Sequence, residues 1–119
     1  MSEEELHNKI NGLLDSAMQQ FVVQDYNEAI RSLKSAEVLD KNNPEIIYNL
    51  AVCYCRMGLY KTSITYFRKI LVAPMTFIDI LTVKKLMAYS LIQLGEYEEA
   101  DSYLNEIIQQ REITKPSDV

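Results

Sequence analysis

The chain has 119 residues, a net charge of −5 and an isoelectric point near 4.8. This length, with 48% apolar residues, fits one small domain with its own core. Only three glycines and three prolines occur, which favours helices over sheets that need frequent turns. The acidic balance argues against nucleic acid or an anionic membrane as partner, since both carry phosphate charge. The sequence shows neither a signal peptide nor an apolar run long enough to span a membrane.

Hydrophobic periodicity and capping residues predict six helices in chain order. Ser2 with Glu5 forms a capping-box pattern that starts the first helix. Asn43 followed by Pro44 starts the third, as a capping residue followed by a proline in the first turn. The six helices are expected over residues 3–23, 26–39, 44–57, 60–72, 77–94 and 97–111.

Three stretches of the chain read alike and define an internal repeat. Each has a turn residue, then a tyrosine two positions later: Tyr26, Tyr60 and Tyr97, spaced by 34 and then 37 residues. A small residue three positions further on allows the paired helices to approach, and a large apolar residue follows four positions later on the same helical stripe. The small residues are Ala29, Ser63 and Ala100, and the large ones are Leu33, Phe67 and Leu104.

Three extra residues lie between the second and third repeats, and we expect an early start of the fifth helix to absorb them. Thr76 with Asp79 is the predicted cap of that helix. At the end of the array, Asp101 and Gln110 occupy positions that are apolar in both earlier repeats. These positions normally pack against a following repeat, so we expect the sixth helix to face water and to end the array without a fourth repeat.

These residues resemble the tetratricopeptide repeat, most closely in the second repeat, with Leu50, Ala51, Tyr54, Gly58 and Phe67. The resemblance implies an all-α fold: a right-handed α-α superhelix of three antiparallel helix pairs. The repeats would lie at about residues 10–43, 44–77 and 81–111, within a single domain over residues 1–111 and before a frayed tail at residues 112–119. The first repeat departs from the pattern, with Gln20 and Gln24 where Tyr and Gly are common.

No motif for catalysis or cofactor binding is present, and we expect a protein that is not an enzyme. Cys53, Cys55 and the distant His7 make a poor zinc set, because zinc usually takes four ligands. The two cysteines lie on different faces of one helix and are not expected to pair; they are read as small apolar residues of a reducing cytoplasm. The clustered carboxylates stand where helices begin and favour the positive end of the helix dipole.

The family architecture implies that the first helix of each pair lines a concave groove. Leucine, methionine and aromatic side chains there suit an apolar or amphipathic peptide of a partner protein. Asn49 would bond to the partner's backbone, and Arg56 and Lys85 would hold an acidic side chain at the rim. The predicted groove residues are Leu14, Met18, Phe21, Tyr48, Asn49, Val52, Arg56, Lys85, Tyr89 and Ile92.

Family members that hold the acidic tail of heat-shock chaperones need a cluster of Lys, Arg and Asn, which this chain lacks. Those positions hold Leu14, Met18, Thr82 and Leu86 here, and only Asn49 matches. A protein-binding adaptor is therefore the leading prediction. A dedicated chaperone, like the small three-repeat chaperones of secretion substrates, is the alternative, although those usually carry an additional N-terminal helix. A self-associating subunit, or apolar residues that pack only within the chain, stay open as well.

Overall fold

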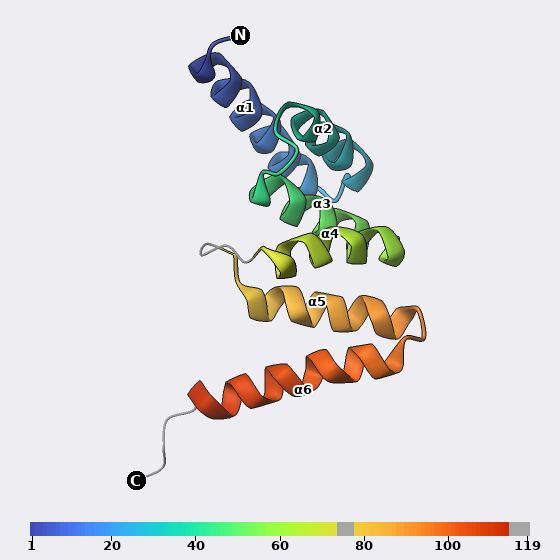
Figure 1. Cartoon of the computed structure of the whole chain (residues 1–119). Coiled ribbons are helices and arrows are strands. Elements are labelled where there is room, and N and C mark those ends of the chain that lie inside the picture. The colour runs from blue at the N-terminus through green and yellow to red at the C-terminus, as the bar shows by residue number, and fades with distance from the viewer. Residues whose placement is uncertain (74–77, 115–119) are drawn as a thin grey trace.

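The computed structural model describes residues 1–73 and 78–114, with side chains as far as Arg111, and these residues form helices and short connections (Figure 1). Five of the helices begin at the residue predicted from the sequence, while the fifth does not. Within the described part of the chain, no helix is both long and apolar enough to cross a membrane. The helices are α1 (Glu3–Val22), α2 (Tyr26–Leu39), α3 (Pro44–Arg56), α4 (Tyr60–Val72), α5 (Ile80–Gln93) and α6 (Tyr97–Thr114).

Side-chain caps start α1 and α3 where the sequence places them. The Ser2 hydroxyl accepts a hydrogen bond from the Glu5 amide at 3.1 Å, which confirms the predicted cap of α1. The side-chain oxygen of Asn43 accepts from the first amides of α3, with Pro44 in the first turn, as predicted. These contacts satisfy amides that have no partner inside the helix, so each helix has a defined first residue.

The predicted early start of the fifth helix is wrong: α5 begins at Ile80, with Asp79 as its cap. The carboxylate of Asp79 accepts from the Leu81 amide at 3.0 Å and from the Thr82 hydroxyl at 2.7 Å. The hydrogen bond from Thr82 is the main reason why the pKa of Asp79 lies below its ordinary value. Thr76, the other predicted cap residue, lies outside the described residues. The fifth helix therefore does not absorb the three extra residues between the second and third repeats by an early start.

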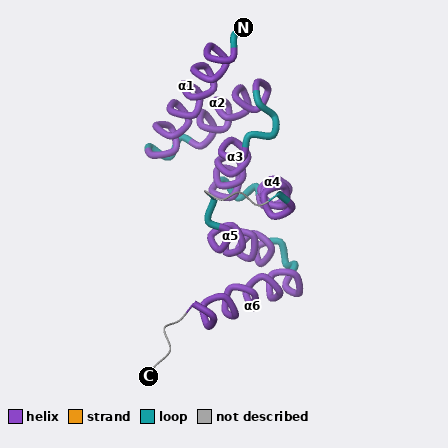
Figure 2. Tube along the Cα trace, turned by 60° about the vertical axis from the view of Figure 1, so that its left-hand side comes forward, coloured by secondary structure: helices purple, strands orange, loops and turns teal. Residues whose placement is uncertain are grey.

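The helices form three antiparallel pairs that stack into an all-α solenoid, and Figures 1 and 2 show α1 and α6 at opposite ends of the stack. The pairs are α1 with α2, α3 with α4, and α5 with α6. Between pairs, α3 packs against α2 and α5 packs against α4, while α3 and α5 also touch. Because each pair contacts only its neighbours, the molecule is elongated, with extents of 55 × 35 × 26 Å.

One hydrophobic core runs through the described residues, and α3 lies at its centre. Since α3 contacts α2, α4 and α5, residues on several of its faces are buried, including both Cys53 and Cys55. The α3–α4 contact is close because position 63 carries a small residue. The buried Ser63 hydroxyl donates to the Ala51 carbonyl at 2.8 Å, so the hydroxyl is satisfied at the helix contact.

The turns inside the three pairs share a left-handed residue. Gln24, Gly58 and Gly95 occupy the same repeat position, with φ of 64°, 77° and 79°. A glycine adopts this conformation without strain, whereas a side chain raises its energy by about 1–2 kcal/mol. The first repeat therefore tolerates at Gln24 a conformation that the other two assign to glycine.

We expect Gly95→Ala to lower the free energy of unfolding by about 1 kcal/mol, because φ at this position is positive. Gly12→Ala is the matched control, and it should raise stability by about 1 kcal/mol because Gly12 lies inside α1. An added Cβ meets nothing within 4 Å at either position, so only the backbone conformation differs. Urea unfolding followed by circular dichroism measures both; a shift of the same sign in the two variants would contradict the assignment.

Candidate binding groove

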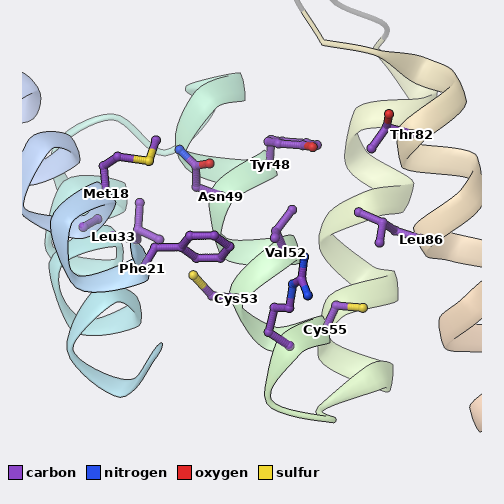
Figure 3. Close-up of a pocket in the computed structure, with 12 residues that line it drawn as sticks. Met18, Phe21, Leu33, Tyr48, Asn49, Val52, Cys53, Cys55, Thr82 and Leu86 are labelled. Carbon is purple, nitrogen blue, oxygen red and sulfur yellow. The ribbon is translucent and has the colours of Figure 1, made fainter. Parts of the chain in front are cut away.

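A pocket of about 330 Å³ opens between the first helices of the three pairs, α1, α3 and α5 (Figure 3). Leu33 of α2, a second helix, also lines the pocket. Three sequentially distant helices line this pocket because the stack brings the first helix of every pair to the same face. We call this pocket the groove; its lining residues are Ala17, Met18, Phe21, Leu33, Tyr48, Asn49, Val52, Cys53, Cys55, Arg56, Thr82 and Leu86.

Apolar side chains form the middle of the groove. Phe21 of α1, Val52 of α3 and Leu86 of α5 lie in a row across it (Figure 3). The ring of Phe21 packs edge-on against Tyr26, with 5.4 Å between the ring centroids. Tyr26 is the repeat tyrosine at the start of α2, so the turn of the first pair orients a groove side chain. Such a row offers an incoming segment a preformed apolar surface.

Polar side chains also line the groove. Asn49, Tyr48 and Thr82 lie on one side of this row in Figure 3, and Arg56 of α3 is a further lining residue. Burial raises the pKa of the Tyr48 phenol, with a further contribution from the charge of Asp79, so Tyr48 stays protonated near neutral pH. Arg56 is the one lining residue with a formal charge at neutral pH. The lining of the groove is thus largely apolar and carries a single positive charge, that of Arg56.

Both cysteines line the groove as free thiols. Burial raises the pKa of Cys53 to about 11, which keeps it protonated and weakly nucleophilic at neutral pH. The sulfur of Cys55 lies 3.5 Å from the Ser90 hydroxyl of α5. Among the described residues no three His, Cys, Asp or Glu side chains are placed to hold a metal ion. The thiols act here as apolar packing groups of α3.

Six of the ten predicted groove residues line the groove: Met18, Phe21, Tyr48, Asn49, Val52 and Arg56. The other four lie elsewhere. Leu14 is buried in the core, and Lys85 is exposed outside the groove. Tyr89 packs edge-on against Tyr60, with 5.9 Å between centroids. Ile92 lines a separate hollow against α6.

The groove also contains residues outside that predicted set. Thr82 and Leu86 have a detectable sequence signal, because they occupy repeat positions expected to face the concave side. Leu33 has none, since it lies on the second helix of its pair and is reached only through the gap between pairs. Sequence position alone therefore indicates which residues turn inward, and the stacking decides which of them meet.

The fold and the groove define a class: a helical-repeat solenoid of three antiparallel pairs with a concave binding surface. Three family models match the sequence, one described as TPR repeat over residues 24–58 and two as tetratricopeptide repeat over residues 45–72 and 86–113. Together they cover more than half of the chain. The chain belongs to the tetratricopeptide repeat family, as its residues predicted.

Solved structures share this fold. The TPR domain of Arabidopsis FLU has a TM-score of 0.79 at 19% identity, covering 91% of this chain and 98% of that one. The type III secretion translocator chaperone SycD of Yersinia enterocolitica has a TM-score of 0.73 at 26% identity, covering 92% and 80%. The first TPR domain of Spaghetti (RPAP3), solved with an HSP90 peptide, has a TM-score of 0.73 at 18% identity, covering 86% and 79%. No curated protein sequence matches the chain significantly.

Proposed function

We propose that this chain is a non-catalytic protein-interaction module that binds an apolar or amphipathic segment of a partner protein in the groove. The observation that carries the proposal is the apolar row across α1, α3 and α5, which is open to a ligand although the rest of the core is packed. A bound segment would cover Met18, which is 52% exposed in the free chain. Burying such surface favours association.

Arg56 adds a charge preference to this proposal. A segment that covers the groove removes water from the guanidinium, and a desolvated charge without a partner is unfavourable. A carboxylate beside the apolar anchors of the segment would satisfy Arg56. Asn49 lines the groove, and its side-chain amide, which both donates and accepts, would bond to the backbone of an extended segment. The predicted roles of Lys85, Tyr89 and Ile92 in binding would then require a ligand that extends beyond the groove.

The groove is a poor match for the acidic tail of a heat-shock chaperone. One structural neighbour, RPAP3, was solved with the HSP90 peptide SRMEEVD. In this chain the positions that would supply lysine and arginine carry Leu14, Met18, Thr82 and Leu86. Leu14 is buried, and the other three give the groove an uncharged wall. We therefore favour a ligand that binds through apolar side chains and carries one acidic residue.

A dedicated chaperone is the second candidate function. SycD, named as a translocator chaperone, covers 92% of this chain at 26% identity. SycD was solved as a dimer, which makes a self-associating form of this chain a candidate as well. Chaperone and adaptor share the same groove chemistry and differ in the client, which is an aggregation-prone secreted protein in one case and a stable assembly component in the other. The buried free thiols Cys53 and Cys55 fit the reducing cytoplasm in which we place the chain.

Selection of a random peptide library on the immobilised chain tests the proposal. We expect enriched peptides with two or more large apolar residues and one Asp or Glu nearby. Binding is then mapped by NMR on the chain labelled at its methionine methyl groups. The Met18 signal should shift, while that of Met87, buried in the core, should hardly move. Ligands that leave the Met18 signal unchanged would contradict the groove as their site.

A further inference from the structure

The last helix pair exposes a residue that the other two pairs bury. Leu33, Phe67 and Leu104 occupy the same repeat position, and they are 1%, 0% and 38% exposed. In the first two pairs the helix that carries this residue is contacted by the first helix of the next pair, since α3 contacts α2 and α5 contacts α4. Figure 1 shows α6 at the end of the stack, with no described helix beyond it. The fold therefore presents this surface on α2, α4 and α6, and within the described residues a following helix covers it on α2 and α4 alone.

This surface is apolar and hollowed. Tyr97, Leu104 and Ile108 follow one another at helical spacing on α6, and all three are exposed. A hollow of about 420 Å³ is lined by Tyr97 and Leu104 and reaches Ile92 of α5, while Ile108 follows one turn after Leu104. We call this surface the end face; it consists of Ile92, Tyr97, Glu98, Asp101, Leu104 and Ile108.

The end face differs from its internal counterparts in charge. Asp101 replaces Ile30 and Ile64 of the earlier pairs, and Glu98 lies next to the same hollow. Both carboxylates are exposed, and the described residues form no ion pair with either. The internal surfaces receive the apolar faces of α3 and α5. A helix that covers the end face must also accommodate two negative charges at its edge.

We propose that the end face is a second docking site, which takes an amphipathic helix of a partner protein with Lys or Arg beside its apolar stripe. The site occupies the repeat position at which the two earlier pairs receive a helix, and the charge preference follows from Asp101 and Glu98. A cation brought close to these carboxylates, where the bound helix excludes water, gains more from the pairing than an exposed pair does. This site is separate from the groove, so both can be occupied together.

Designed model helices test the proposal on the full chain. The first is an 18-residue helix with leucines on one face and lysines beside them. The second has glutamates in place of the lysines, and the third has the lysine composition with its leucines scattered around the helix. We expect the first to bind at least tenfold more tightly than the other two and to shift the NMR signals of Leu104 and Ile108. Equal binding of the two lysine helices would overturn the proposal, because net charge alone would then explain it.

Two variants assign the binding to the end face. Ile108→Glu should weaken binding of the first model helix at least tenfold, and Asp101→Lys, which leaves Glu98 in place, should reduce the preference for the first helix over the glutamate helix. Asp101 is exposed, so Asp101→Lys should fold even if Ile108→Glu does not. Unchanged binding in a folded Asp101→Lys variant would overturn the proposed charge preference. A dimer of the free chain in light scattering that Ile108→Glu dissociates would overturn the proposal in favour of a second copy as occupant.

Discussion

Phe67→Ala is expected to lower the free energy of unfolding by about 3–5 kcal/mol, the range typical of a large aromatic removed from a packed core. Phe67 is fully buried in α4, which contacts both α3 and α5. The deletion leaves a cavity at the point where the second and third helix pairs join. Because a repeat protein is stabilised by contacts between neighbouring pairs, the loss should also loosen the third pair from the rest.

Urea unfolding followed by circular dichroism measures this loss. Leu104→Ala is the control, because it removes a large side chain at the same repeat position of the last pair. Leu104 is 38% exposed, so its loss should lower stability by clearly less than that of Phe67, about 1 kcal/mol. Similar losses in the two variants would contradict the picture of a buried internal contact and an open end face.

Met18→Glu is expected to weaken the binding of peptides selected for the groove by about 100-fold or more, which corresponds to roughly 2.7 kcal/mol of binding free energy. Met18 lines the groove, and a glutamate there would place a charge against the apolar row of Phe21 and Val52. A bound segment would have to desolvate that carboxylate without a partner. In the free chain the position is half-exposed, so the variant should stay folded.

Val38→Glu is the matched control for this prediction. Val38 lies on α2, is 86% exposed and does not line the groove. It introduces the same charge into the same acidic chain, so it accounts for any general effect of charge on binding. Fluorescence anisotropy with a labelled selected peptide measures both variants. Undiminished affinity in a folded Met18→Glu variant would remove the groove from the account of this protein.

The sequence predicted the helices well because their signals are local. Capping side chains such as Ser2 and Asn43 satisfy nearby amides, and they mark a helix start regardless of the rest of the fold. The start of α5 was predicted wrongly because the local signal before it is ambiguous. Thr76 and Asp79 are both capping residues, and only the connection length taken by the stack decides between them.

The amino-acid sequence by itself determined the helix pairs, their period and the family, because repeat spacing and apolar stripes are properties of consecutive residues. It also placed Met18, Val52 and Arg56 on the inward side of their helices. Only the tertiary structure decided which inward residues meet: Leu14 is buried in the core, and Tyr89 packs on Tyr60. The physical reason is that a groove arises from contacts between helices far apart in sequence, and their separation depends on side chains of every pair.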